Sequence, residues 1–306
     1  MKCHICKDKA VIKLRQHSLA LCARHFDEWM LRRVQKAISD FKMFSKKDKI
    51  ILAVSGGKDS LALWDILTRL GYYTSGLYIN LGITHDGYSD ESEELCWVFV
   101  RNRKCDLIVV DITQAHGMTV MQKARAKHRS ICSACGLTKR YYMNQVAITK
   151  GFDVIATGHN LDDQAAALLG NILHWNVLYL ANGSPYSPPI GEGHPAKTKP
   201  LFLCTEKETT TYCLLRNISF VEKECPYAED ATFLEWKRLL NRAEERSPGT
   251  KWAFYRGYLK NMYLFAGECA EKEPPYKCKI CGLPSWHDTC SFCRFWKVDN
   301  ASKQNQ

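Results

Sequence analysis

Residues 50–60 constrain the fold more than any other part of this chain. An apolar run, Ile-Ile-Leu-Ala-Val, is followed at once by Ser-Gly-Gly-Lys-Asp-Ser and then by helical spacing. A buried strand that enters a Gly-Gly turn and a helix is typical of a nucleotide phosphate site, because glycine lets the backbone approach an anion and the first helical amides point at it. The spacing matches neither Gly-x-x-x-x-Gly-Lys-Ser/Thr nor Gly-x-Gly-x-x-Gly. We therefore expect a phosphate site of another class.

Strand-like and helix-like segments alternate through the centre of the chain. We expect strands at 50–54, 75–80, 106–111 and 154–157, and helices at 60–70, 89–102, 118–126, 136–150 and from 161 to about 173. This alternation predicts an α/β fold with a doubly wound parallel sheet. Ligands bind such sheets at the carboxyl ends of the strands, where residues 55–60 and 158–163 both fall.

The remaining segments predict the domain organisation. Residues 182–200 are rich in Pro, Gly and Ser and predict a long loop, whereas 205–246 and 250–266 read as helices interrupted at 247–249. The expected units are an N-terminal zinc module (1–28), a connecting helix (29–45), a catalytic domain (46–266), a C-terminal zinc ribbon (276–296) and a flexible tail (297–306).

Cysteine usage points to metal binding. The chain has fifteen cysteines, no stretch apolar enough for a membrane span and no signal-peptide pattern, which favours the cytoplasm, where disulfides are rare. Two residues between ligands let both face one ion from a tight turn, and two such turns complete the closed tetrahedron of structural zinc. The two sets are Cys3, Cys6, Cys22 and His25, and Cys278, Cys281, Cys290 and Cys293.

A third cysteine group is less defined. Cys132 and Cys135 form a single Cys-x-x-Cys, and Cys225 is a plausible distant partner. Three thiolates suit an iron–sulfur cluster with one iron left open, but a redox dithiol or unrelated core cysteines are alternatives.

Basic residues are in excess, with a formal net charge of +11. A basic surface beside a nucleotide site favours a nucleic-acid partner, although an ordinary solvated face is equally compatible with composition alone. The two basic groups are Lys123, Arg125, Lys127, Arg129, Lys139 and Arg140, and Arg238, Arg242, Arg246, Lys251, Arg256 and Lys260.

Taken together, the motifs resemble those of a known family. The order is an N-terminal zinc knuckle, Ser-Gly-Gly-Lys-Asp-Ser, a central Cys-x-x-Cys, Gly-His-Asn-x-Asp-Asp at 158–163 and a C-terminal zinc ribbon. It resembles the TtuA/TtcA family of tRNA 2-thiolation enzymes in the PP-loop ATP pyrophosphatase superfamily, in particular the TtuA-like branch with two zinc modules. The resemblance covers residues 1 to about 296.

The resemblance implies a set of site residues. The PP-loop would bind ATP, with Asp59 helping to hold Mg²⁺, and Lys139 and Asp163 look like the family's catalytic pair. The ATP-binding residues would be Ser55, Gly56, Gly57, Lys58, Asp59, Ser60, Gly158 and His159. The ligands of a [4Fe-4S] cluster, two of them with catalytic roles, would be Cys132, Cys135 and Cys225.

The implied activity is ATP-dependent tRNA 2-thiouridine synthesis. ATP would adenylate O2 of a uridine, with position 54 favoured over 34, and sulfur would replace it. A different PP-loop adenylating ligase, cytidine or anticodon-uridine thiolation and a zinc-finger RNA-binding protein are the alternatives. The implied partners are tRNA, a second copy in a homodimer and a sulfur donor, whether sulfide, a persulfide or a ubiquitin-like carrier protein.

Overall fold

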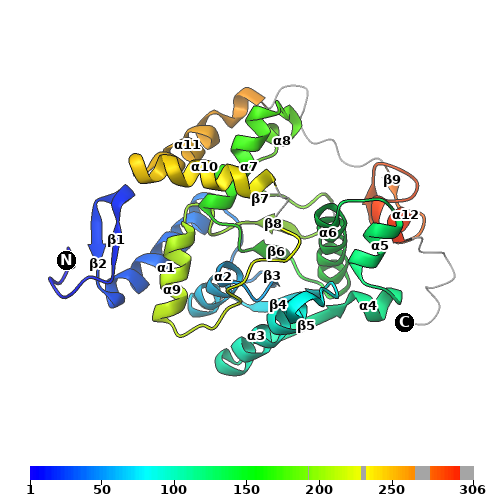
Figure 1. Cartoon of the computed structure of the whole chain (residues 1–306), viewed down its shortest axis with the longest axis horizontal. Helices are drawn as coiled ribbons and strands as arrows, with labels where there is room; N and C mark the ends of the chain where they lie inside the picture. Colours follow the sequence, from blue (N-terminus) through cyan, green and yellow to red (C-terminus); the bar gives the residue numbers. More distant parts are fainter. Residues whose placement is uncertain (192, 229–231, 266–275, 297–306) are drawn as a thin grey trace.

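A six-stranded sheet forms the centre of the protein (Figure 1). The computed structural model describes residues 1–191, 193–228, 232–265 and 276–296. The strands are β3 (Ile50–Val54), β4 (Thr74–Asn80), β5 (Asp106–Asp111), β6 (Val154–Thr157), β7 (Tyr186–Ser187) and β8 (Ala196–Thr198). Their order is β5-β4-β3-β6-β8-β7, and every neighbouring pair is parallel except β7 with β8. The predicted α/β fold is confirmed, with one antiparallel edge strand added.

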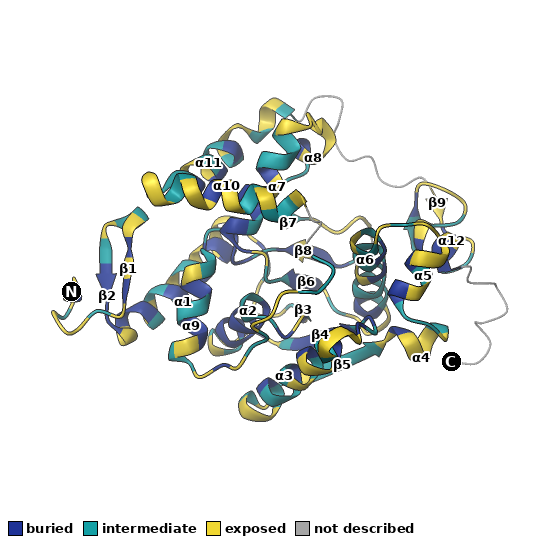
Figure 2. Cartoon of the chain, in the orientation of Figure 1, coloured by how far each residue is buried: buried dark blue, intermediate teal, exposed yellow. Residues whose placement is uncertain are grey.

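Helices cover both faces of this sheet. Successive residues of β3 point to opposite faces, since Leu52 belongs to one buried apolar cluster and Ile51 to another. The first face packs against α1 (Ala23–Asp40), α2 (Lys58–Arg69), α3 (Tyr88–Arg103), which follows η2 (His85–Gly87), and α9 (Glu206–Leu215). The second face packs against α4 (Ile112–His116), α5 (Val120–Ala126) and α6 (Ile131–Thr149). The central strands are accordingly buried from both sides (Figure 2).

A helical part lies at the top of the view in Figure 1. It consists of α7 (Leu161–Leu173), α8 (Val177–Ala181), α10 (Thr232–Arg246), α11 (Thr250–Asn261) and η3 (Met262–Phe265). Ala165 and Ala166 of α7 pack with Leu240 of α10 in a small apolar cluster of their own. Because α7 starts directly after β6, this part is tied to the carboxyl ends of the strands.

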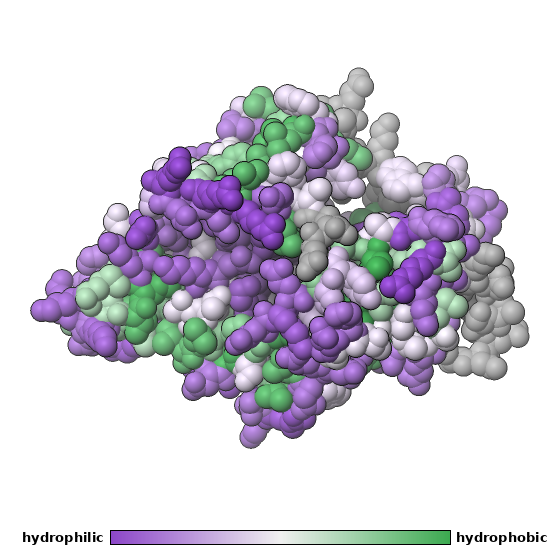
Figure 3. Space-filling model, viewed as in Figure 1, coloured by the Kyte–Doolittle hydropathy of each residue, from purple (hydrophilic) through white to green (hydrophobic). Residues whose placement is uncertain are grey.

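Two small modules lie at opposite ends of the molecule (Figure 1). The N-terminal module has β1 (Ile12–Leu14) paired with β2 (Leu19–Leu21) through η1 (Arg15–His17). The C-terminal module has β9 (Tyr276–Lys277) paired with β10 (Pro284–Ser285), followed by α12 (Ser291–Trp296). Hydrophilic side chains cover much of the face visible in Figure 3. None of the helices in the described parts of the chain combines the length and the apolar character of a membrane span.

Two helix starts differ from the sequence expectation. The connecting helix begins at Ala23 rather than at residue 29, so it starts inside the N-terminal metal module. Helix α6 begins at Ile131 rather than at residue 136, because Gly136 lies within the helix instead of preceding it. An interior glycine costs about 1 kcal/mol relative to alanine, which tertiary packing outweighs here. Cys132 and Cys135 are therefore helical residues.

Two longer segments were also mispredicted. Residues 182–200 are not a plain loop, because they contribute β7 and β8, and the Ala196 amide donates to the Asp153 carbonyl at 2.9 Å. Residues 205–246 are not one helical stretch, because 216–228 is non-helical. The Val221 amide of that segment donates to the Gly56 carbonyl at 2.9 Å, so pairing with the phosphate loop replaces the helix. The expected tail at 297–306 lies outside the described residues.

Candidate active site

The turn between β3 and α2 has the geometry of an anion site. Gly56 has a φ of +71°, and a Cβ there would come within 2.5 Å of the Ser92 carbonyl oxygen, so only glycine fits. The Ser60 hydroxyl donates to the Gly57 carbonyl at 3.0 Å and accepts from the Ser55 amide at 3.2 Å, which fixes the turn. No side chain among the described residues caps the start of α2. Its first amides are available for a phosphate, as predicted for this loop.

A cavity of about 320 Å³ opens beside this turn. It lies at the carboxyl ends of β3, β4 and β6, the edge where the sequence places the ligand. The structure brings seven of the predicted site residues into its lining: Ser55, Asp59, Ser60, Lys139, Gly158, His159 and Asp163. Gly56, Gly57 and Lys58 belong to the same loop but do not line the cavity itself.

The loop after β6 packs directly against the phosphate loop. A Cβ at Gly158 would come within 2.7 Å of the Ser60 amide nitrogen, so glycine is required for this contact. His159 accepts from or donates to the Thr157 hydroxyl at 2.8 Å, and burial lowers the pKa of its imidazole. Asp163 forms a capping box with Asn160 at the start of α7 and also lines the cavity. Asp163 therefore stabilises the start of α7 and is also placed where it could take part in a reaction in the cavity.

Asp59 is held by groups from distant parts of the chain. The Thr209 hydroxyl of α9 donates to its Oδ1 at 2.5 Å, and the Lys58 ammonium lies 3.1 Å from its Oδ2. Burial raises the pKa of the Asp59 carboxyl, and Lys58 and Thr209 oppose that effect. A bound cation would favour the charged carboxylate in the same way.

A row of alternating charges continues from Lys58. The Glu206 carboxylate lies 3.6 Å from Lys58 and 2.7 Å from Lys237, and Lys237 lies 2.7 Å from Asp163. Sequence reasoning missed Glu206, Thr209 and Lys237. They carry no motif, and Thr209 is 150 positions away from Asp59 along the chain. Their position on helices α9 and α10, next to the phosphate loop, becomes visible only in three dimensions.

The third cysteine group lies on α6 and in the segment 216–228, and none of its members lines the cavity. Cys132 and Cys135 lie on the first two turns of α6, and the Cys132 thiol donates to the Tyr227 carbonyl at 3.4 Å, next to Cys225. Burial raises the pKa of the Cys135 thiol to about 11, Lys139 opposes this, and Cys225 and Cys132 add to it. Lys139 follows Cys135 by about one turn of α6 and lines the cavity.

Both terminal ligand sets are assembled as predicted. In each set the four ligand atoms lie within 4.8 Å of one another, and in the part of the chain that the structure describes no other such group of His, Cys or carboxylate ligands occurs. Cys22 Sγ is 3.3 Å from His25 Nδ1, and Cys281 Sγ is 3.8 Å from Cys290 Sγ. A tetrahedral ion with bonds of about 2.3 Å to sulfur separates its ligands by about 3.8 Å. Both sets could hold a metal ion.

Comparison with known families matches this architecture in two parts. A PP-loop domain matches residues 27–231, and the N-terminal LIM domain of the 2-thiouridine synthetase TtuA matches residues 2–27. The first match includes the phosphate loop, the loop after β6 and all three cysteines of the third group. The second includes the complete N-terminal ligand set.

Similar proteins extend over nearly the whole chain. Proteins named tRNA-5-methyluridine(54) 2-sulfurtransferase from Pyrococcus horikoshii and Thermus thermophilus are 47% and 43% identical, over 97% of this chain and 94% and 91% of their own lengths. The solved structure of the U34-tRNA thiolase NcsA from Methanococcus maripaludis, with its [4Fe-4S] cluster, covers 97% of this chain and 96% of its own. Its TM-score of 0.79 at 24% identity shows a shared fold. The chain belongs to the TtuA-like branch of the PP-loop family of tRNA 2-thiolation enzymes.

Proposed function

We propose that this protein is an ATP-dependent tRNA uridine 2-sulfurtransferase that acts on uridine 54. The observation that carries the proposal is the single cavity in which the phosphate loop, Lys139 and Asp163 meet, with the three cysteines beside it. Relatives that are 40–47% identical over 97% of the chain are named for position 54. The U34 thiolase NcsA is only 24% identical. Position 54 is therefore the better supported site.

The phosphate loop serves the first half of the reaction. The amides at the start of α2 and the Lys58 ammonium stabilise negative charge on the phosphates of ATP. O2 of the uridine attacks the α-phosphorus, and pyrophosphate leaves. Uridine O2, a poor leaving group, becomes part of AMP, which is a good one.

Divalent metal binding fits the acidic groups at this site. Asp59 and Asp163 both line the cavity and offer the oxygen ligands that Mg²⁺ prefers. Lys237 pairs with Asp163, and Lys58 with Asp59, so each carboxylate lies beside a cation. We propose that Asp59 holds Mg²⁺ bound to the ATP phosphates and that Asp163 holds a metal or a proton during uridine activation.

The three cysteines fit an iron–sulfur cluster. Their sulfurs do not gather as tightly as either terminal set, which suits a cluster that is larger than a single ion. A [4Fe-4S] cluster held by three thiolates leaves one iron without a protein ligand, where a sulfur species can bind. We propose Cys132, Cys135 and Cys225 as the ligands, and Lys139 as the cation that stabilises charge between the cysteines and the adenylated uridine. The identity of the sulfur donor stays a prediction.

Two structural zinc ions are part of the proposal. All four positions are filled by protein ligands in each terminal set, which leaves no place for a reacting water. Metal analysis of protein purified without oxygen should find about two zinc ions per chain.

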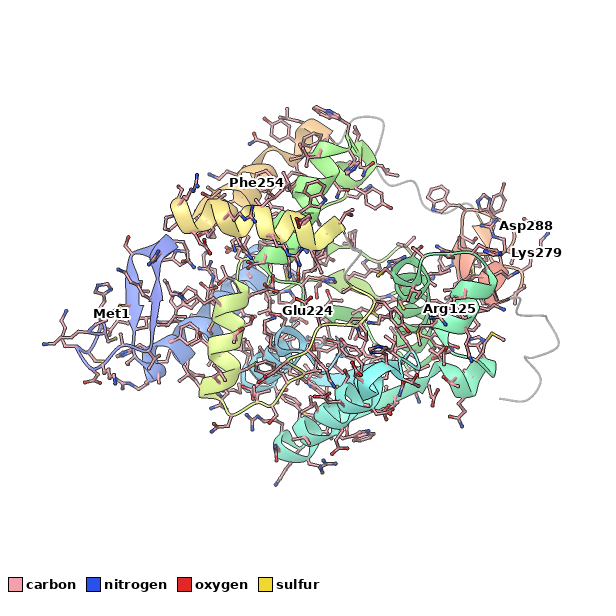
Figure 4. All side chains as sticks on the ribbon, viewed as in Figure 1. Met1, Arg125, Glu224, Phe254, Lys279 and Asp288 are labelled. Carbon is pink, nitrogen blue, oxygen red and sulfur yellow. The ribbon has the colours of Figure 1, made fainter. Side chains whose placement is uncertain are left out.

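The exposed basic residues beside the cavity provide a surface for tRNA. Arg125 on α5 (Figure 4), Lys127 and Arg140 are exposed on one side, and Arg238 and Arg242 on the other. One predicted member is wrong, because Lys251 is buried and forms an ion pair with Asp162. We propose that the exposed members contact tRNA phosphates.

We also propose a second copy of the chain as a partner, through a surface on α8 and η3. Its exposed large side chains are Trp175, which precedes α8, and Leu178, Tyr179, Tyr263 and Leu264. Residues 164–191 contain no Asp, Glu, Lys or Arg. In a chain of charge +11, this surface can meet its own copy without like-charge repulsion. Sedimentation should show a dimer that Leu178→Glu dissociates, whereas Leu214→Glu, at an exposed leucine elsewhere, leaves it intact.

Nucleoside mass spectrometry tests the proposed function. tRNA from cells that lack the protein should lose the 2-thio group at position 54, and the purified protein should restore it with ATP, Mg²⁺ and sulfide under anaerobic conditions. Loss of the 2-thio group at position 34 instead would contradict the assigned uridine. Unchanged tRNA in the deleted cells, with no thiolation by purified protein, would contradict the activity.

A further inference from the structure

Helix α6 has two different faces along the same turns. Cys132, Cys135, Lys139 and Met143 are spaced by three or four residues and therefore share one face of the helix. Lys139 and Met143 line the cavity, so this face is directed at the proposed reaction. Any rotation or shift of α6 moves the reactive groups together.

The C-terminal module contacts α6 at Thr138 and Tyr141, outside the row of Cys132, Cys135, Lys139 and Met143. The Tyr141 ring stacks on Phe292 with centroids 3.5 Å apart and an interplanar angle of 1°. The indole N–H of Trp296 donates to the buried Thr138 hydroxyl at 3.3 Å. Tyr141 lies about half a turn away from Cys132 and Lys139, whereas Thr138, three residues after Cys135, borders the cysteine face. One ring contact and one hydrogen bond thus fix both the rotation and the height of α6.

The cysteines of the C-terminal module hold the helix that carries Phe292 and Trp296. Phe292 and Trp296 lie on α12, a helix that starts directly after Cys290 and contains Cys293. The Cys290 amide donates to Cys278 Sγ at 3.3 Å, and the Cys293 amide donates to Cys290 Sγ at 3.4 Å. The four-cysteine set therefore determines where α12 presents its aromatic rings.

We propose that Phe292 and Trp296 are positioning residues for sulfur transfer. Their contacts with Tyr141 and Thr138 fix the position of α6, so that Lys139 and the two cysteines are directed toward the cavity. The inference rests on the proposed function, because it assigns the C-terminal module a part in that reaction. A misplacement of about 1 Å at a reacting group can cost as much as a hundredfold in rate. One residue along a helix is already a rise of 1.5 Å and a rotation of 100°.

The test compares Phe292→Leu with two controls. Phe292→Leu keeps an apolar side chain but removes the ring stack. Tyr141→Phe keeps the stack and should behave as the wild type. Val34→Ala opens a cavity in α1, in the other apolar cluster, and should lower Tm without reaching α6. Each protein is used as the full chain with its metals.

Two readouts separate positioning from general stability. Amide hydrogen exchange at residues 131–139 should be at least tenfold faster in Phe292→Leu than in the wild type and both controls. Single-turnover thiolation should fall at least tenfold in Phe292→Leu, with the KM for ATP within twofold of the wild type. Unchanged exchange in Phe292→Leu, or equal rate losses in Phe292→Leu and Val34→Ala, would overturn the proposal. Failure of the wild type to thiolate tRNA would contradict the proposed function, and the exchange experiment would still decide whether α12 fixes α6.

Discussion

The two terminal modules present similar sets of four metal ligands but are joined to the rest of the molecule in different ways. In the N-terminal module, the ligand His25 lies in the first turn of α1, and Phe26, Met30 and Val34 of that helix are fully buried in the main core. In the C-terminal module, α12 has only six residues and packs on α6. The first module is part of the apolar cluster on one face of the sheet, and the second packs on α6, on His116 of α4 and on Lys123 of α5 in the cluster on the other face.

The two modules also contact different helices that position site residues. The Gln16 side chain donates to the Glu208 carboxylate of α9 at 2.7 Å, and α9 supplies the Thr209 hydroxyl that binds Asp59. The C-terminal module contacts α6, which carries the cysteines and Lys139. If the proposed function holds, the N-terminal module supports the adenylation side and global stability, whereas the C-terminal module supports the sulfur-transfer side.

Loss of one metal ligand should give the largest difference between the modules. Cys22→Ser should lower the free energy of unfolding by more than about 4 kcal/mol, because the metal site and the start of α1 belong to the main core. Cys290→Ser should leave ATP binding and the main unfolding transition intact while thiolation is lost. Calorimetry measures the unfolding transition, and titration with ATP measures nucleotide binding. Equal losses of Tm in both variants would show that the modules are equivalent.

The buried carboxyl of Glu208 should make the N-terminal attachment sensitive to pH. Burial raises its pKa to about 7, from about 4.5 in the unfolded chain. The folded state then binds the proton more tightly, so this group's contribution to stability is complete below pH 4.5 and is lost as the pH rises to 7. The loss amounts to roughly 3 kcal/mol.

Glu208→Gln should remove that pH dependence. Unfolding by urea at several pH values between 4.5 and 8 should show a stability that falls with pH in the wild type and a flatter profile in the variant. Gln122→Glu, which adds an exposed carboxyl on α5, serves as a control. If the stability of the wild type rises between pH 4.5 and 8 by more than that of the control, the raised pKa of Glu208 is contradicted.

The hydroxyl of Thr209 should matter for adenylation rather than for the cysteines. Thr209→Val keeps the shape but removes the hydrogen bond to Asp59, which raises the pKa of a carboxyl that burial already raises. The acid limb of ATP-dependent pyrophosphate release should move to higher pH, with a loss at neutral pH of about tenfold, or 1.4 kcal/mol. The visible spectrum of the cysteine-bound cluster should not change. A pH profile identical to the wild type would exclude this role.

The smallest contrast concerns two ion pairs, one in each module. Asp27 forms a two-pronged pair with Arg69, at 2.5 and 2.6 Å, that joins α1 to α2. Asp27→Asn should cost about 1–2 kcal/mol in urea unfolding. Asp288 pairs with Lys279 on the exposed surface of the C-terminal module (Figure 4), so Asp288→Asn should leave Tm unchanged. A greater loss of stability in Asp288→Asn than in Asp27→Asn would contradict this difference between the modules.

The parts of the site that could be predicted are those whose residues are close in sequence. The phosphate loop and the two four-ligand sets are local motifs, and the strand–helix alternation predicts where they lie. Glu206, Thr209 and Lys237 could not be predicted, because their role depends on how α9 and α10 pack beside α2. Gly136 misled the helix boundary because glycine is only moderately unfavourable inside a helix. Strands β7 and β8 were missed because two or three residues among prolines carry no strand pattern.

The central claim is that the phosphate loop and the cysteines perform separate half-reactions in one cavity. The most direct measurement is tRNA-dependent pyrophosphate release and thiolation by Asp59→Ala and Cys132→Ala, each after anaerobic cluster reconstitution. Asp59→Ala should keep the visible absorbance of the cluster and lose both pyrophosphate release and thiolation. Cys132→Ala should lose the cluster and thiolation while it still binds ATP. Thiolation at a normal rate by Cys132→Ala would show that the cysteines do not transfer sulfur, and the account would be wrong.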